Sequence, residues 1–305
     1  MTRNWIKTPD GRCVRRRPSR LELFLKDNEP PLATGQDVSF DLETTAPSSS
    51  QEPDYHTADF DPRKLHGGEV TIFGAGSVGS YLAWFLAVLG LVLNVIDPKR
   101  VEYKHMRGGR TVYDSASVGL FKVEALKRKI EAEHLGTTVR PYPFNAAEIT
   151  TPDLRDMCER SLAVALAMDD PNEIPRVARL AYPVTDLVQV AMHAQAASGH
   201  IALSIPFVTP CWACTMGISD ATPIHRLDSE AGNAWDIIAV AQTASRVIID
   251  LLYCRRTGRP ITRWDVTKNL IYISNTAQEI SPDGPGVTYE GSQRRPGCQI
   301  CNRLP

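Results

Sequence analysis

A glycine-rich loop between an apolar run and a helix-like segment constrains the fold of this chain more than any other feature. Residues 70–73 are a β-branched run that ends at Gly74-Ala-Gly76-Ser-Val-Gly79, and residues 77–89 have helical spacing. The first glycine allows a tight turn, the second lets backbone approach a phosphate, and the third lets helix and strand pack closely. The free N–H groups of the helix N-terminus favour an anionic ligand. The loop therefore predicts a nucleotide-binding α/β domain.

Short apolar runs alternate with helix-like segments through the middle of the chain. Three further strands are predicted, at residues 91–97, 138–144 and 162–167, and two helices, at 117–134 and 174–182. Such alternation is typical of a mainly parallel, Rossmann-like sheet covered by helices on both faces. The later elements are consecutive strands at 187–194 and 200–205, a long helix at 235–254 and a strand at 263–274. They predict a mixed, antiparallel C-terminal portion of the same α/β fold.

Composition limits the class of protein. The chain has 305 residues, of which 43% are hydrophobic, and this is enough for a large core. The formal net charge is −1, and no apolar run reaches about 18 residues, so we expect neither nucleic acid nor a membrane as a partner. Residues 1–62 hold a basic cluster and then a Pro/Ser/Thr-rich stretch. We predict a partly flexible N-terminal extension (1–62) and one folded domain (63–305).

Two Cys-x-x-Cys pairs, Cys211–Cys214 and Cys298–Cys301, are separated by residues 215–297. Four thiolates form the closed tetrahedral shell of a structural zinc, so the pairs predict a Zn²⁺ site that joins the C-terminal end to the body of the domain. Two disulfides or four idle thiols are the alternatives. Paired motifs without an export signal favour a reducing, cytoplasmic setting.

A basic string follows the second predicted strand. Asp97 ends that strand, where a carboxylate can bind ribose hydroxyls. Arg107 and Arg110 come next, and Lys122 lies near a predicted helix start. A triphosphate needs several cations to hold its charge and to stabilise the departing pyrophosphate, whereas hydride transfer does not. Arg110 and Lys122 are therefore candidate phosphate-binding residues, with solvated surface positions as the alternative, which is favoured for Arg107.

From residue 74 to residue 301 the chain resembles the ThiF/MoeB/E1 superfamily, whose members activate ubiquitin-like proteins. The family pattern is Gly-x-Gly-x-x-Gly, then Asp-x-Asp-x-Val-Glu-x-Ser-Asn-Leu-x-Arg-Gln, then Gly-x-x-Lys. A strand ending in Ala-Thr-Asp-Asn follows, and two Cys-x-x-Cys pairs flank a long helix. The residues that match are Gly74, Gly76, Gly79, Asp97, Val101, Glu102, Gly119, Lys122, Ala167, Asp169, Cys211, Cys214, Cys298 and Cys301.

Several positions depart from the family pattern, and three of these departures bear on the predicted site. The family's Asn falls on His105, its Arg is matched by Arg110 across a small shift, and its Thr-Asp-Asn reads Met168-Asp169-Asp170. The resemblance implies that Asp169 handles Mg-ATP with Asp170 as its neighbour. His105 is expected to donate one hydrogen bond to phosphate in place of Asn. A surface histidine and a polar loop after a buried strand are the alternative interpretations.

The resemblance implies a reaction in which ATP adenylates the C-terminal carboxylate of a ubiquitin-like or sulfur-carrier protein that ends in Gly. Acyl-AMP and pyrophosphate result, and Mg²⁺ neutralises phosphate oxygens. The resemblance also implies a homodimer. The acyl group would pass to an E2-like protein, a sulfur donor or a modified peptide.

A thioester cysteine is not evident in the sequence. In relatives it lies between the first Cys-x-x-Cys pair and the long helix, and residues 215–233 contain no cysteine. Cys13, Cys158 and Cys254 remain, and Cys254 lies beside two arginines that could lower its pKa. Packing is the favoured role for Cys158 and Cys254, so we expect direct transfer of the acyl group to a partner.

Two other classes of protein stay open. An NAD-dependent oxidoreductase with a structural zinc would explain the glycine loop and Asp97, but not Lys122 or Asp169. A catalytically degenerate E1-like scaffold would explain why the family's Asn, Arg and Thr positions are altered.

Overall fold

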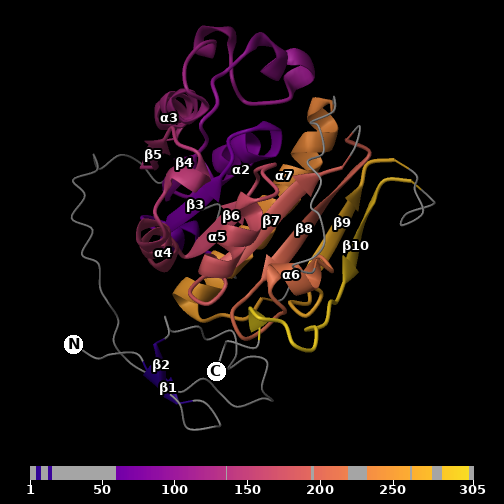
Figure 1. Ribbon diagram of the computed structural model, residues 1–305. Coiled ribbons are helices and arrows are strands. Elements are labelled where there is room, and N and C mark those ends of the chain that lie inside the picture. Colours follow the sequence, from indigo (N-terminus) through magenta and orange to yellow (C-terminus); the bar gives the residue numbers. More distant parts are fainter. Residues whose placement is uncertain are drawn as a thin grey trace.

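An eight-stranded sheet runs through the computed structural model, with helices on both faces (Figure 1). The structure describes residues 5–7, 13–15, 60–134, 136–193, 196–218, 232–261, 263–276 and 284–301. The strands of the sheet are β3 (Glu69–Phe73), β4 (Val92–Ile96), β5 (Thr138–Tyr142), β6 (Ala163–Leu166), β7 (Asp186–Met192), β8 (Ser198–Ser204), β9 (Leu270–Ser274) and β10 (Gly286–Glu290). Two further short strands, β1 (Trp5–Lys7) and β2 (Cys13–Arg15), pair with each other.

The strand order is β10-β9-β8-β7-β6-β3-β4-β5. Strands β5, β4, β3, β6 and β7 are mutually parallel, and β8, β9 and β10 join antiparallel to their neighbours. The predicted Rossmann-like class with an antiparallel C-terminal portion is therefore confirmed. From β3 the chain first builds β4 and β5 on one side and later β6 and β7 on the other. The carboxyl ends of β3 and β6 thus form a topological switch point, where open α/β sheets bind ligands.

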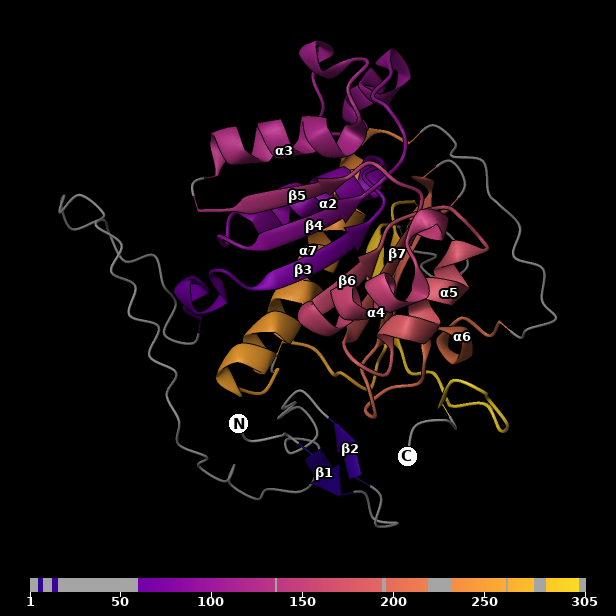
Figure 2. The ribbon, with the colours of Figure 1, turned by 60° about the vertical axis from the view of Figure 1, so that its left-hand side comes forward.

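The helices form two layers (Figure 2). One hydrophobic core joins the sheet to α2 (Ser77–Ala87), α3 (Lys122–Glu133) and α7 (Ala234–Thr257). A second core, on the opposite face, joins it to α4 (Thr151–Arg160), α5 (Glu173–Ala181) and α6 (Trp212–Thr215). Short 3-10 helices are η1 (Pro62–Leu65), η2 (Tyr103–His105), η3 (Arg107–Gly109), η4 (Ser115–Ser117) and η5 (Ala146–Glu148).

Two predicted boundaries are wrong, and β10 was not predicted. The helix expected from residue 117 begins at Lys122, because Gly119 has a φ of 90° and interrupts any helix there. The strand expected over 263–274 is confined to β9. Phe60 packs on Tyr253 of α7 with ring centroids 4.8 Å apart, and the proposed domain division at residue 62 remains a prediction.

Helix α7 is long and apolar enough to cross a membrane by length and composition alone, yet 67% of its most apolar window is buried inside the molecule. It packs against α2, β7 and β8. Burial of this extent identifies α7 as a core helix of the domain.

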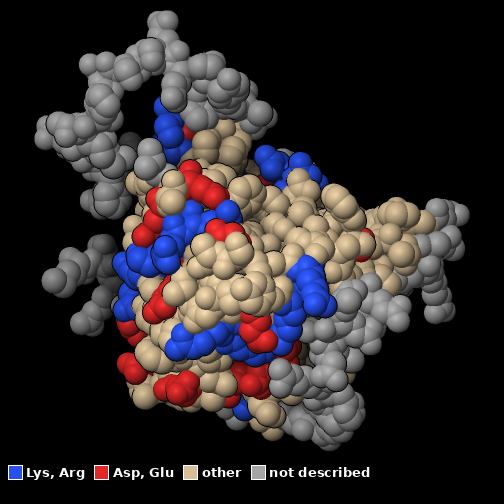
Figure 3. Space-filling model, turned by 90° about the horizontal axis from the view of Figure 1, so that it is seen from above, with Lys and Arg blue, Asp and Glu red and all other residues tan. Residues whose placement is uncertain are grey.

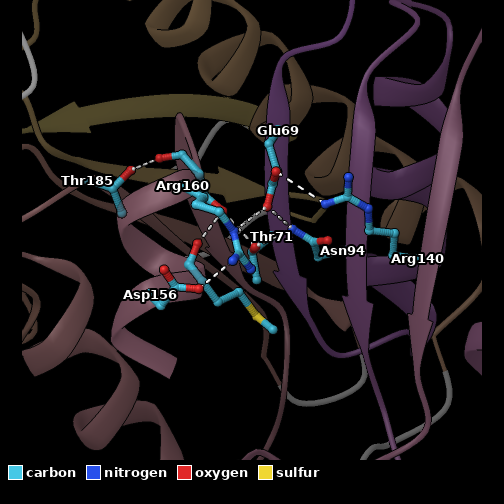
Figure 4. A network of polar contacts seen from close by, with 9 residues as sticks. Glu69, Thr71, Asn94, Arg140, Asp156, Arg160 and Thr185 are labelled. Carbon is cyan, nitrogen blue, oxygen red and sulfur yellow. Dashed lines mark hydrogen bonds and ion pairs between the residues drawn. The ribbon is translucent and has the colours of Figure 1, made fainter. Parts of the chain in front are cut away.

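A polar network lies at the amino ends of the parallel strands, where Glu69 is its centre (Figure 4). Asn94 donates to the Glu69 carboxylate over 2.8 Å, and Arg140 and Arg160 form ion pairs with it at 3.3 Å and 3.6 Å. The network joins β3, β4 and β5 to the end of α4. Because it lies at the opposite edge from the glycine loop, we interpret it as structural.

A chain of hydrogen bonds joins β7 to β8. His200 Nε2 lies 2.7 Å from Gln189 Oε1, and His200 Nδ1 lies 2.8 Å from His193 Nε2. Because an amide oxygen only accepts, His200 carries its proton on Nε2 and accepts from His193 at Nδ1. Burial, and to a smaller extent the charge of His193, lowers the pKa of His200 to about 4, so that the His200 imidazole is neutral at pH 7.

The free energy of unfolding should therefore fall as the pH is lowered from about 6.5 to about 4. In this range the unfolded chain protonates His200 and the folded chain does not, so the unfolded state binds more protons. Urea unfolding at pH 7.5 and pH 4.5 should show that His200→Gln removes up to about 3 kcal/mol of this pH dependence. Parallel pH profiles for the variant and the unmodified protein would contradict the assignment.

Candidate functional site

The glycine loop follows β3 at the switch point, and its three glycines differ in their surroundings. Gly74 has a φ of 98°, and a Cβ there would lie 2.4 Å from the backbone oxygen of Ala167, just after β6. A Cβ at Gly79 would lie 2.0 Å from the backbone oxygen of Gly74. At Gly76 no atom lies within 4 Å of the Cβ position, and no side chain caps α2. The fold therefore requires Gly74 and Gly79, whereas Gly76 leaves open space at the α2 N-terminus.

Asp97 joins this loop to the one after β4. Its Oδ2 accepts from the backbone N–H of Ala75 and its Oδ1 from that of Lys99, both over 2.8 Å. The Tyr113 hydroxyl donates to the Ala75 carbonyl over 2.7 Å. Each carboxylate oxygen keeps a second lone pair, which a ribose hydroxyl could use.

Lys122 begins α3 and is only 5% exposed. Burial lowers the pKa of its ammonium, while the charges of Asp97 and Asp169 act in the opposite direction. Within the described residues Lys122 forms no ion pair. A desolvated ammonium without a direct counter-ion is unfavourable, and it is stabilised when an anion binds beside it.

The two carboxylates after β6 lie in different environments. Asp169 is exposed, and its Oδ1 lies 3.5 Å from Lys99 Nζ. Asp170 is half-buried, and its Oδ1 accepts from the N–H groups of Asn172 and Glu173 over 2.9 Å and 3.3 Å. One oxygen of Asp170 therefore caps the start of α5, and Asp169 is the carboxylate that faces the lysines.

His105 lies at the end of η2, and its Nδ1 accepts from the backbone N–H of Glu102 over 2.8 Å. Burial lowers the pKa of His105 to about 4, and the charges of Lys122 and Arg110 act in the same direction. The imidazole is therefore neutral with its proton on Nε2, which leaves Nε2 as a donor. Arg110 follows η3 and is half-buried within electrostatic reach of His105.

The structure thus collects most of the sequence-predicted residues at one edge of the sheet, namely Gly74, Gly76, Gly79, Asp97, His105, Arg110, Lys122 and Asp169, with Asp170 beside them. Figure 3 looks onto this edge, where Lys and Arg form a band with Asp and Glu among them. The catalytic and binding roles of these residues remain predictions.

The sequence did not identify Lys99 as a candidate site residue, and it did not distinguish Lys99 from the neighbouring Arg100. Lys99 occupies the second aspartate position of the family pattern. Its place two residues after Asp97, within the basic string, was the available signal. Arg100 instead stacks on Phe121 with its guanidinium 3.8 Å from the ring centroid, and it donates to the Gly119 carbonyl over 2.7 Å. Arg100 therefore holds the loop in place.

The four cysteines of the two pairs form one buried cluster toward the amino ends of the parallel strands. All four Sγ atoms lie within 4.8 Å of one another. The Sγ–Sγ distances are 3.6 Å for Cys211 and Cys298, and 3.7 Å for Cys214 and Cys301. A tetrahedral zinc with Zn–S bonds of about 2.3 Å requires about 3.8 Å between sulfurs, so the cluster fits this metal. Tyr182, which follows α5, packs against it.

The other cysteines do not provide an exposed nucleophile among the side chains that the structure describes. Cys158 and Cys254 are both buried, and burial raises the pKa of each to about 12. The pKa of Cys254 is therefore not lowered overall, because burial and the charge of Asp186 outweigh the lowering effect of neighbouring Arg255, which forms an ion pair with buried Asp186. The side chain of Cys13 lies outside the described residues.

A Rossmann-type sheet with a glycine loop at its switch point, and a four-cysteine cluster that joins the C-terminal segment to the sheet, define an α/β fold of the nucleotide-binding type. The ThiF family model matches residues 56–252, and this chain belongs to the ThiF family. No curated protein matches the chain.

Solved structures share this fold. E. coli MccB with ATP has a TM-score of 0.61 and 18% identity over 79% of this chain and 68% of its own. The microcin C7 biosynthetic enzyme MccB in complex with N-formylated MccA has a TM-score of 0.63 and 18% identity, over 79% and 69%. PaaA has a TM-score of 0.57 and 17% identity, over 76% and 66%. At such identities the likeness shows the fold alone.

Proposed function

We propose that this protein is an E1-like adenylyltransferase, which uses ATP to activate a C-terminal carboxylate of a peptide or carrier protein. The observation that carries the proposal is Lys122, a buried ammonium without an ion pair among the described residues, at the switch point beside the glycine loop. Membership of the ThiF family supports the proposal. MccB, which shares the fold, has been solved with ATP and in complex with N-formylated MccA.

The described residues fit ATP and Mg²⁺. The open space at Gly76 and the uncapped α2 N-terminus suit phosphate oxygens, and Asp97 has lone pairs for the ribose. Asp169 offers the carboxylate oxygen that Mg²⁺ prefers. When bound, Mg²⁺ neutralises phosphate charge.

In the proposed reaction the substrate carboxylate attacks the α-phosphorus, so that a carboxyl-oxygen–phosphorus bond forms. The bond from that phosphorus to the bridging oxygen of pyrophosphate breaks, and its electron pair leaves with pyrophosphate. Lys122 and Arg110 would hold and neutralise the phosphates as charge moves onto the leaving group, and the Nε2–H of His105 would orient one oxygen.

We further propose that the substrate is a ubiquitin-like or sulfur-carrier protein that ends in Gly. Direct transfer of the acyl group to an E2-like protein or a sulfur donor is favoured, because the described cysteines outside the cluster are buried with raised pKa values. The cysteine cluster would hold a structural Zn²⁺ and take no part in transfer.

A homodimer is proposed from the outer surface of α2. Tyr81, Trp84 and Phe85 are half-buried there, and Val88 beyond them is exposed. Trp235 at the start of the neighbouring α7 is 76% exposed. A helix that is apolar all round is usually buried or part of an interface. Light scattering at micromolar concentration should therefore give twice the chain mass, and a monomer mass would contradict this proposal.

Exchange of labelled pyrophosphate into ATP tests the proposed activity. The full chain with Mg-ATP and a Gly-ending carrier should show exchange, and the same carrier with an amidated C-terminus is the matched control. NAD binding without ATP binding would favour the oxidoreductase. ATP binding without exchange or an AMP adduct would favour a degenerate scaffold.

A further inference from the structure

The backbone of Lys99 is held directly beside that of Lys122. The Lys99 N–H donates to Asp97 over 2.8 Å, and the Lys99 carbonyl accepts from the Lys122 N–H over 2.9 Å. The next residues, Arg100 and Phe121, form an isolated antiparallel bridge. The loop after β4 and the start of α3 are thereby fixed, and both lysines belong to one small region.

The side chain of Lys99 crosses the mouth of the candidate site. Its Nζ reaches from the loop after β4 to Asp169 after β6, at 3.5 Å. Because β3 lies between β4 and β6 in the sheet, this ion pair passes over the end of β3, where the glycine loop begins. The side chains of Lys99 and Asp169 are 50% and 44% exposed. Such exposed ion pairs contribute little stability, so Lys99 can leave Asp169 for another anion at little cost.

Lys99 and Lys122 together form a positive centre. The charge of Lys99 lowers the pKa of Lys122, which places the two ammonium groups within electrostatic reach of each other. Asp169 is the ion-pair partner of Lys99. When a cation binds Asp169, the Lys99 ammonium needs another anion, and a nucleotide's phosphates at the glycine loop would provide one.

We propose that Lys99 is a second phosphate-binding residue of this site: it neutralises Asp169 in the free protein and turns to the triphosphate when Mg-ATP binds. The inference rests on the proposed function. The family pattern has an aspartate at the position of Lys99. A negatively charged aspartate could not bind phosphate in this way, whereas the positively charged Lys99 can.

Calorimetry with the full chain tests the inference through affinity. Lys99→Met should raise the Kd for Mg-ATP about tenfold or more and leave the affinity for adenosine unchanged, because adenosine has no phosphate. The slope of log Kd against log salt concentration should also decrease. Lys104→Met is the matched control, since Lys104 lies in the same loop, is 64% exposed and pairs with Glu102 at 2.9 Å.

Each outcome has a distinct meaning. An unchanged or tighter Mg-ATP affinity in Lys99→Met, with the unmodified protein binding ATP, overturns the inference and leaves the proposed function intact. Equal loss of ATP and adenosine binding would indicate a structural role and also overturns it. Failure of the unmodified protein to bind ATP overturns both proposals.

Discussion

Lys122→Met should reduce carrier-dependent ATP–pyrophosphate exchange by about a hundredfold or more, because one donor aimed at developing negative charge supplies an effect of this size. The same variant should be at least as stable as the unmodified protein. Burial lowers the pKa of Lys122, so at pH 7 the charged lysine costs stability that an uncharged methionine of similar length does not. Exchange assays and thermal unfolding of the same preparations measure both effects.

Lys129→Met is the matched control for this prediction. Lys129 lies in the same helix, and its ammonium pairs with Glu133 at 2.7 Å on the surface of α3. Its exchange rate should stay within about twofold of the unmodified protein. Full exchange activity in Lys122→Met would contradict the role given to Lys122, and a variant that unfolds would contradict the electrostatic argument.

Cys298→Ser should abolish zinc binding and lower the free energy of unfolding by about 4 kcal/mol. The physical reason is that the metal joins α6, which packs on β8, to the C-terminal segment that follows β10. For a chain of 305 residues such a loss corresponds to a thermal midpoint lower by roughly 6 °C. Metal analysis by mass spectrometry should give one zinc for each unmodified chain and almost none for the variant.

Cys254→Ser is the matched control, because it shows how much stability a buried cysteine contributes through packing without any loss of metal. Cys254 is buried in α7 outside the cluster, so its variant should keep zinc even where packing loss lowers stability. Because the cluster lies toward the edge opposite the glycine loop, the Kd for Mg-ATP of folded Cys298→Ser should change little. A zinc-free unmodified protein, or a Cys298→Ser variant of unchanged stability, would refute the structural metal.

Much of the fold could be predicted from the sequence because its signals are local. The buried parallel strands are short apolar runs, and the glycine loop has a fixed spacing at the β3–α2 turn. Strand β10 gave a weak signal because it is an edge strand with few buried side chains. The start of α3 was placed too early because the apolar periodicity continued through Gly119, where the backbone conformation is not helical.

The candidate site was predicted only as a set of residue types. The sequence alone could not separate Arg100, which holds the loop through Phe121, from Lys99, which faces Asp169. It also suggested a lowered pKa for Cys254, whereas burial raises the pKa to about 12. In both cases the deciding quantity is the surroundings of a side chain, which depend on elements far away in the chain.

The sequence by itself determined the phosphate-type loop, the pairing of each Cys-x-x-Cys motif and the alternation of strands and helices, because these are set by residues a few positions apart. Only the tertiary structure decided that β3 lies between β4 and β6, so that Lys99 reaches Asp169 across the glycine loop. It also brought the two cysteine pairs to sulfur distances of 3.6 Å and 3.7 Å. Strand order and long-range packing bring these groups together, and neither is encoded in local spacing.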